Sequence, residues 1–446
     1  MTATTLLKPQ NRVHHWWSMY DWANSAYNLV ITSTIFPAYY DAVTSVKKDN
    51  VIVQDQVSFF GRELSNSALF MYALSFAYLV ICLLSPLLSS IADLKGNKNK
   101  FLLFFCGIGA LACMALYFFT GAQLELGIIS FVIATIGYCG SLVFYNAYLP
   151  EIATVEQRDR LSARGFTYGY IGSFLLQIIC FLFVMKPEWF GQDAAWGSRF
   201  SFFLVGVWWL FFGWLSVHNL PRNTLSRENK RMNILTNGFL ELKKVAQQVR
   251  NIPVLQYFLI AFLFYSMGVQ TVMLAATLFG TKELSLSTDQ LIITILIIQL
   301  VAILGAYLMS RLSALFGNIR VLVFTVIIWI GICIAAYFVH TAMHFYIIAS
   351  VVGLVMGGIQ SLSRSTYSKL MPKTKDTASF FSFYDITEKV AIVIGMFSFG
   401  FIDQMSGSMR NSIAALVIFF FIGLILLLRT QGKSKAIIQT SDSHNT

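Results

Sequence analysis

Apolar segments of about 20 residues recur along the whole chain, and this feature constrains the fold more than any other. A helix of that length rises about 1.5 Å per residue, so it crosses the roughly 30 Å of a bilayer's hydrocarbon core. The segments are continuous apolar blocks, whereas a membrane barrel would need short alternating strands. We therefore expect an all-α polytopic membrane protein. Twelve spans are placed near residues 17–40, 66–91, 101–120, 126–149, 164–185, 198–219, 254–279, 287–310, 320–339, 345–367, 380–403 and 409–429.

The composition also favours a bilayer over a soluble fold. Of the 446 residues, 57% are hydrophobic and 12% are charged, which leaves too little polar surface to cover a globular protein. The six cysteines lie inside apolar runs, so we interpret them as small buried side chains and expect neither disulfides nor a metal site. The first apolar stretch has no small-residue cleavage site and is interpreted as the first span.

The net charge of +11 comes from basic residues that gather on alternate loops. If the N-terminus is cytoplasmic, the inner loops hold most of these residues, among them Lys95, Arg160, Arg231 and Lys373. The positive-inside rule then places both termini in the cytoplasm and explains the charge as membrane topology, without a nucleic-acid partner. We expect an inner (plasma) membrane location.

Three short motifs occur twice, in the same order and about 222 residues apart. Gly96-Asn97-Lys98 returns as Gly317-Asn318-Ile319, Leu149-Pro150 as Met371-Pro372, and Ile171-Gly172 as Ile394-Gly395. Parallel six-helix repeats of this kind are the architecture of the major facilitator superfamily. We predict an N-terminal six-helix bundle (1–219), a cytoplasmic linker (220–253), a C-terminal six-helix bundle (254–429) and a cytoplasmic tail (430–446).

Within the linker, apolar residues recur every three or four positions from Leu235 through Phe239 and Val245 to Ile252. This spacing predicts an amphipathic helix. The helix could lie on the inner leaflet or pack against the ends of the bundle, and the sequence favours neither.

No catalytic motif is present, because the chain has no P-loop, no H-E-x-x-H and no G-x-S-x-G. We expect neither an enzyme nor a cofactor. Transport would then be driven by gradients and not by ATP.

Polar side chains inside the spans are costly in hydrocarbon, so they mark candidate functional positions. In the first span Asp21, Asn24 and Asn28 recur at helical spacing and form a polar stripe. We predict that Asn24 and Asn28 line a solute pathway. Asp21 stands among tryptophans and could equally mark the cytoplasmic interface.

The eleventh span carries Asp385, Glu388 and Lys389 within little more than one helical turn. At roughly 3 kcal/mol for each central charge against roughly 0.5 kcal/mol per large apolar residue, three unpaired charges would cancel most of the insertion energy. They must be paired or hydrated. Asp385 and Lys389 have the favourable i, i+4 order, which leaves Glu388 in need of a partner, and Arg364 is a candidate.

These charges could bind a solute or a proton, or they could form an ion-pair latch that closes the inner gate. We favour the latch for the eleventh span. For Arg364 we favour solute binding, because a guanidinium grips a carboxylate in bidentate fashion. No histidine lies at mid-membrane, so proton coupling would have to use Asp21, Glu151, Asp385 or Glu388.

The inner loop around Asp93 and Gly96 resembles the loop signature of the major facilitator superfamily, with Ser89 where glycine is usual. A closer resemblance is carried by Asp21-Trp22-Ala23-Asn24-Ser25-Ala26-Tyr27, Phe144-Tyr145-Asn146-Ala147-Tyr148-Leu149-Pro150-Glu151, Gly357-Gly358-Ile359-Gln360-Ser361-Leu362-Ser363-Arg364-Ser365, and Phe383-Tyr384-Asp385 with Lys389. These motifs are similar to the vacuole-effluxer-like branch, which includes autophagy-related vacuolar amino-acid exporters of fungi. The resemblance implies efflux of small organic solutes, with amino acids as the best-supported class. This chain has Met396 where the family usually has proline after the glycine.

We predict a secondary active transporter of small organic solutes whose two bundles rock around a central cavity. The expected solute contacts are Asn24, Asn28, Tyr145, Asn146, Gln270, Gln360 and Arg364. The expected gating or proton-coupling residues are Asp21, Asp93, Glu151, Arg164, Asp385, Glu388 and Lys389. The expected partners are a small-molecule solute, a coupling proton or other ion, and the bilayer, and we expect a monomer. Two alternatives stay open: a flippase for amphipathic or lipid-linked cargo, and a membrane receptor or scaffold that transports nothing.

Overall fold

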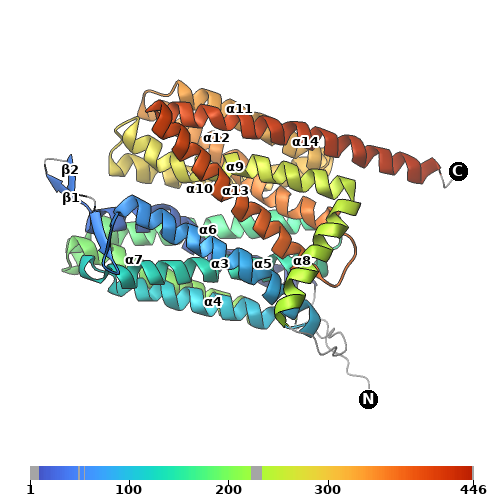
Figure 1. The fold of residues 1–446 in the computed structure, drawn as a ribbon, viewed down its shortest axis with the longest axis horizontal. Coiled ribbons are helices and arrows are strands. Elements are labelled where there is room, and N and C mark those ends of the chain that lie inside the picture. The colour runs from blue at the N-terminus through green and yellow to red at the C-terminus, as the bar shows by residue number, and fades with distance from the viewer. Residues whose placement is uncertain (1–9, 49–50, 55, 222–233, 444–446) are drawn as a thin grey trace, which may run out of the picture. The chain divides into compact units, whose positions relative to one another are not determined.

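The structure is a computed structural model that describes residues 10–48, 51–54, 56–221 and 234–443. Helices make up most of this part of the chain (Figure 1). The helices that correspond to the predicted spans are α1 (Gln10–Ala26), which continues through a π-helix (Tyr27–Ile35) into α2 (Phe36–Thr44), then α3 (Asn66–Lys95), α4 (Lys98–Ala115), α5 (Leu124–Ile152), α6 (Arg158–Met185), α7 (Ala194–Asn219), α9 (Pro253–Lys282), α10 (Thr288–Phe316), α11 (Asn318–Tyr337), α12 (Ala342–Leu370), α13 (Thr377–Ser406) and α14 (Met409–Ser443). Every predicted span falls on one of them, so the prediction of an all-α polytopic fold is confirmed.

Ten helices of the described chain are long and apolar enough to cross a membrane. The two other predicted spans are the stretch from α1 to α2 and the helix α13. They are the spans that contain the buried polar residues Asp21, Asn24, Asp385 and Lys389. Both of these spans therefore carry candidate functional groups that the sequence analysis named.

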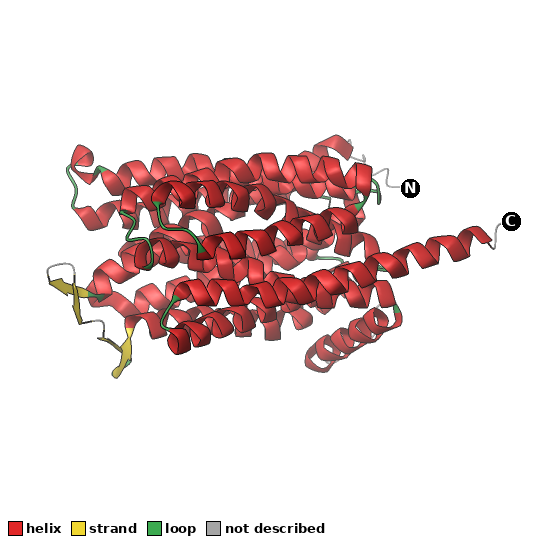
Figure 2. Cartoon of the chain, turned by 90° about the horizontal axis from the view of Figure 1, so that it is seen from above, coloured by secondary structure: helices red, strands yellow, loops and turns green. Residues whose placement is uncertain are grey.

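Two small β-hairpins between α2 and α3 were not predicted. β1 (Val46–Lys48) pairs antiparallel with β2 (Val51–Gln54), and β3 (Gln56–Phe59) pairs with β4 (Arg62–Ser65). Phe60 and Gly61 form the turn of the second hairpin with φ of 48° and 74°, both positive, as a type I′ turn requires. Within the described residues, strands are confined to these hairpins (Figure 2). These strands have only three or four residues, so a search for apolar segments of about 20 residues does not detect them.

Matching glycines support the internal repeat. Gly96 ends α3 with φ of 64° and Gly317 ends α10 with φ of 86°, and the next helix begins almost at once in both cases. A Cβ added at Gly172 of α6 would lie 2.8 Å from a backbone oxygen of α1, and one at Gly395 of α13 would lie 2.6 Å from a backbone oxygen of α9. In each predicted half, the fifth span thus packs closely against the first span at a corresponding glycine.

The chain forms two compact units, which are described separately. The first unit is Met1–Tyr145 with Ile171–Arg231, and the second is Asn146–Tyr170 with Met232–Thr446. The second unit therefore includes the end of α5 and the start of α6, which belong by sequence to the N-terminal repeat. We call Asn146–Tyr170 the α5–α6 segment.

The linker contains the predicted helix, α8 (Ile234–Asn251). It packs against α9 and α13, and Val245 and Val249 on it are buried. These contacts favour packing against the bundle for the C-terminal part of α8. The side chains of Leu235 and Phe239 lie outside the described residues.

Candidate functional site

In the first unit, the polar stripe of α1 is turned toward the protein interior. Asp21 and Asn24 are buried, and Asn28 is half-buried. The hydroxyl of Tyr145 donates to Oδ2 of Asp21 at 2.7 Å, and the Tyr145 ring stacks on Trp17 with ring centroids 4.4 Å apart. Burial and this hydrogen bond favour an internal role for Asp21 over one at the membrane interface. They also make Tyr145 the partner of a carboxylate.

Asn24 is the polar residue of this stripe that lacks a partner. Its side chain is 1% exposed, and neither its amide nitrogen nor its amide oxygen has a hydrogen-bond partner among the described residues. A buried amide without partners costs about 1–3 kcal/mol. Such a group gains from any bound molecule that offers both a donor and an acceptor.

Asp93 forms an ion pair inside the first unit. Its Oδ1 lies 3.1 Å from Nζ of Lys98, and the two side chains are only 3% and 2% exposed. Gly96 makes the left-handed turn between them, so the end of α3 is held to the start of α4. The loop recognised in the sequence is therefore built around a buried ion pair.

In the second unit, Arg364 of α12 binds the α5–α6 segment. Its side chain is buried, Nε donates to the Ser162 hydroxyl at 2.9 Å, and Nη2 donates to the Ser162 carbonyl at 2.9 Å. Nη1 donates to Oδ1 of Asn146 at 3.3 Å, and the guanidinium lies 4.3 Å from the centre of the Phe166 ring. The structure thus brings together two predicted solute contacts, Asn146 and Arg364, and adds Ser162.

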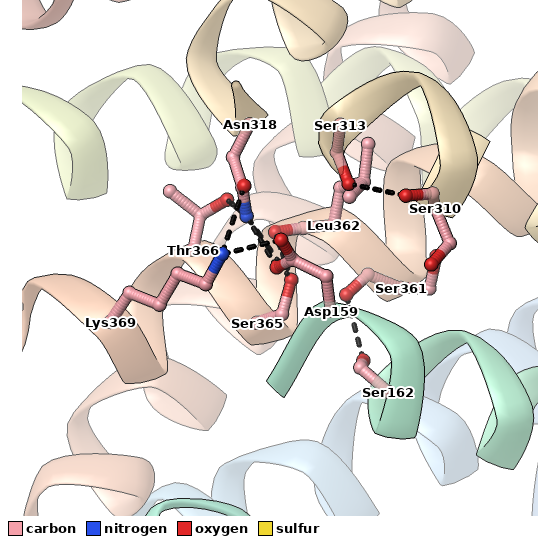
Figure 3. A network of polar contacts seen from close by, with 10 residues as sticks. All are labelled: Asp159, Ser162, Ser310, Ser313, Asn318, Ser361, Leu362, Ser365, Thr366 and Lys369. Carbon is pink, nitrogen blue, oxygen red and sulfur yellow. Dashed lines mark hydrogen bonds and ion pairs between the residues drawn. The ribbon is translucent and has the colours of Figure 1, made fainter. Parts of the chain in front are cut away.

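A second set of contacts joins the same helices, and sequence reasoning missed it (Figure 3). Oδ1 of Asp159 accepts from the Asn318 amide at 2.6 Å, and Oδ2 is bonded by Nζ of Lys369. Lys369 also donates to Oδ1 of Asn318 at 3.1 Å, and the Asn318 amide reaches the Thr366 hydroxyl at 3.1 Å. We call Asp159, Asn318, Thr366 and Lys369 the α6–α12 clasp.

Two further bonds run beside the clasp. The Ser162 hydroxyl donates to the Ser361 carbonyl at 2.7 Å, and Nη1 of Arg158 donates to the Ser368 carbonyl at 2.6 Å. The sequence contained one signal for this region, an acid placed between two arginines at Arg158-Asp159-Arg160. Those arginines were counted only as loop charges, and no local pattern points to a carbonyl about 200 residues away.

The predicted gating residues Glu151 and Arg164 have different surroundings. Oε1 of Glu151, at the end of α5, accepts from the Thr377 hydroxyl at the start of α13 at 2.5 Å. Arg164 donates to the Tyr168 hydroxyl at 3.1 Å, one turn further along α6, and stacks over that ring. Glu151 therefore bridges the α5–α6 segment to α13, whereas this contact of Arg164 is local.

The three charges of α13 form a connected group. Nζ of Lys389 lies 3.3 Å from Oδ1 of Asp385 and 3.0 Å from Oε2 of Glu388, which confirms the predicted i, i+4 pair. The Gln270 amide of α9 donates to Oε1 of Glu388 at 3.1 Å. The suggestion that Arg364 pairs with Glu388 is wrong, because Gln270 and Lys389 bind Glu388 and the α5–α6 segment engages Arg364.

Gln360 also contacts the α5–α6 segment. Its Oε1 accepts from the Tyr170 hydroxyl at 2.9 Å, and the side chain is half-buried. One turn away on α12, the Ser363 hydroxyl is 2.7 Å from the Tyr265 hydroxyl of α9. Gln360 and Ser363 thus give α12 two polar contacts about one turn apart.

Twelve predicted spans, repeated helix ends and buried intramembrane charges define a multi-pass transporter of the major facilitator type. Comparison with known proteins then gives the family. The model of the family described as vacuole effluxer Atg22 like matches residues 10–437, and the chain belongs to this family.

Relatives and solved structures agree with this assignment. The uncharacterized MFS-type transporter YxiO of Bacillus subtilis (strain 168) is 30% identical over 424 residues, which are 95% of each chain. Autophagy-related protein 22 of Yarrowia lipolytica is 25% identical over 83% of this chain and 77% of that protein. The human organic anion transporter MFSD10 has a TM-score of 0.69 at 12% identity over 94% of this chain and 100% of that one. The proton:xylose symporter XylE has a TM-score of 0.69 at 13% identity over 94% of both chains.

The solved structures show the fold alone, and the family adds the class of activity. The chain is a multi-pass membrane protein and a secondary transporter, and it is not an enzyme.

Proposed function

We propose that the chain exports small organic solutes that bear a carboxylate, with amino acids as the leading class. The membrane would be the inner (plasma) membrane and both termini would be cytoplasmic, in keeping with the positive-inside distribution of Lys and Arg. Residues 1–219 and 254–429 would be the two bundles of an alternating-access cycle, joined by the linker 220–253.

The observation that carries the substrate class is the environment of Arg364. Arg364 is 3% exposed, and the acceptors of its guanidinium include a hydroxyl, a carbonyl and an amide oxygen of the α5–α6 segment. A carboxylate would bind the same donors about twice as strongly and in bidentate geometry. A solute carboxylate can therefore compete with Ser162 and Asn146 for Arg364.

This exchange would couple binding to opening. Ser162 and Asn146 lie on the α5–α6 segment, so losing them as partners of Arg364 would weaken the attachment of α12 to that segment. The α6–α12 clasp, and Glu151 with Thr377, would then form the remainder of the inner latch. In the first unit, Asn24 is proposed separately as a solute contact, because its buried amide has no hydrogen-bond partner among the described residues.

The test uses a matched pair of ligands and a matched pair of variants. Detergent-purified protein is screened by thermal shift against amino acids and against their carboxamides, which lack only the carboxylate. A ligand at a hundred times its dissociation constant stabilises the protein by about 2.7 kcal/mol. We expect stabilisation by a carboxylate ligand but not by its carboxamide.

Arg364→Lys should keep the fold yet abolish both this stabilisation and counterflow of the same solute in proteoliposomes, because an ammonium cannot form the bidentate grip. Arg320→Lys, at an exposed position of α11, is the control and should behave as the parent. Unaffected transport in Arg364→Lys would contradict the proposed solute role of Arg364.

A further inference from the structure

We propose that Asp385, Glu388 and Lys389 form a proton-binding site that couples solute export to proton movement, with Asp385 as the acceptor. The inference rests on the proposed function, because it concerns the ion that drives the same transport cycle. The group would thus act in coupling and not as a latch.

The three charges of α13 do not balance. Two carboxylates and one ammonium leave one negative charge when all three are ionised. Asp385 and Lys389 are 3% and 4% exposed, and α13 is one of the predicted spans. A net charge within a membrane span is costly, and binding one proton removes it.

The geometry selects Asp385 as the acceptor. Oδ1 of Asp385 is paired with Lys389, but Oδ2 is buried and has no hydrogen-bond partner among the described residues. Glu388 is more exposed, at 22% of its side chain, and both of its oxygens are bonded, one by Gln270 and the other by Lys389. A proton is therefore bound most favourably by Asp385, and Lys389 keeps its ion pair with Glu388.

Among the described residues, the charged groups that interact electrostatically with Asp385 are Lys389 and Glu388 of the same helix. Two groups on neighbouring helices interact electrostatically with residues of α13. Tyr265 of α9 interacts with Glu388, and Arg364 of α12 interacts with Tyr384. The ammonium of Lys389 lies between the two carboxylates, where a metal cation would need its oxygen ligands, so the site favours a proton over sodium.

A ring contact between α12 and α13 links the neighbourhoods of Arg364 and Asp385. The Tyr384 ring, next to Asp385, is 4.9 Å from the ring of Tyr367, which lies on α12 three residues beyond Arg364. Movement of α12 on solute binding would thus shift Tyr384 and, with it, the neighbouring Asp385 of α13. A switch of Lys389 between Asp385 and Glu388 would then release or accept the proton.

The experiment uses proteoliposomes that contain the full chain, a solute identified by counterflow and a trapped pH-sensitive dye. In the parent protein, we expect a solute gradient to move protons and a pH gradient to drive net solute flux. In Asp385→Asn, we expect the solute-driven pH change to be lost. Asp403→Asn, at the other end of α13, is the matched control and should retain it.

Retention of the pH change in Asp385→Asn, or replacement of the pH gradient by a sodium gradient as the driving force, would overturn the proposal. Net solute flux by the parent down a solute gradient without any proton movement would overturn it while leaving the proposed export function intact. Absence of counterflow for every carboxylate solute would instead remove the proposed function.

A second measurement needs no variant. A hydrophobic carbodiimide reacts with protonated carboxyls in lipid-facing or buried positions, and the adduct is located by peptide mass spectrometry. Labelling of Asp385 in the parent should decline as the pH rises. Labelling that is absent at every pH would contradict the proposal even if Asp385→Asn fails to fold.

Discussion

Replacing Asp159 by asparagine tests whether the α6–α12 clasp holds α6 against α12. Asp159→Asn keeps the shape of the side chain but removes its charge and presents an NH₂ group to the donors of Asn318 or Lys369. In the structure, the side chain of Asp159 is 9% exposed and that of Lys369 is 23% exposed. The substitution therefore weakens hydrogen bonds between a largely buried acceptor, Asp159, and a partly hydrated cation, Lys369.

The magnitude follows from these two exposures. A hydrogen bond to a charged group contributes about 1.5–3 kcal/mol, and the part shared with Lys369 must be reduced because that ammonium can turn to solvent. We expect the contact between α6 and α12 to weaken by about 2 kcal/mol, which is about 30-fold in the equilibrium between closed and open states.

The assay is the rate at which a water-soluble maleimide labels Ser361→Cys in a cysteine-free background. Ser361 is 1% exposed, and its carbonyl accepts from Ser162, so labelling requires α6 to leave α12. Glu241→Gln removes the solvent-exposed ion pair with Lys244 on α8 and serves as the control. An unchanged labelling rate in Asp159→Asn would show that the clasp does not limit opening.

Three further predictions concern single positions. Gly172→Ala should destabilise the protein by about 1–3 kcal/mol because the new methyl meets the α1 backbone, whereas Gly400→Ala, with open space around it, should not; thermal unfolding compares them. Lys98→Met should lower the unfolding temperature clearly, because removing one partner of a buried ion pair costs about 3–5 kcal/mol, and restoration by Asp93→Asn is the check. Asn24→Ala should leave the unfolding temperature unchanged or higher, since its amide is unpaired, yet reduce the solute-induced thermal shift.

The helices were predictable because each apolar segment reports its own length, and the pairing of Asp385 with Lys389 was predictable because i, i+4 spacing is local. The clasp was not predictable in this way. Asp159 and Lys369 are separated by 210 residues, and each looks like an ordinary loop charge in the sequence. Only the fold brings them together.

The partner of Glu388 was also not predictable from the sequence. Arg364 was chosen for its charge, but a neutral amide, Gln270, satisfies the carboxylate together with Lys389. A prediction from charges along the chain selects a cation as the partner of a carboxylate. It gives no reason to prefer a neutral amide donor on another helix. The hairpins between α2 and α3 were missed for a simpler reason, since strands of three or four residues leave little periodicity to detect.

The two repeats treat their corresponding loops differently, and this difference leads to a last prediction. In the N-terminal repeat, Lys98 pairs with Asp93 within the loop between α3 and α4. In the C-terminal repeat, Ile319 stands where Lys98 would be, and the neighbouring Asn318 binds Asp159 of the α5–α6 segment. The first loop thus holds two neighbouring helices together, while the second reaches a segment from the other repeat.

Lys98→Met and Asp159→Asn should therefore differ in kind. We expect Lys98→Met to lower thermal stability without changing the labelling rate of Ser361→Cys, since the ion pair that it removes joins α3 to α4. Asp159→Asn should raise the labelling rate with a smaller loss of thermal stability. If Lys98→Met raises labelling as much as Asp159→Asn does, Asp93 belongs to the gate after all, and the distinction between the two loops fails.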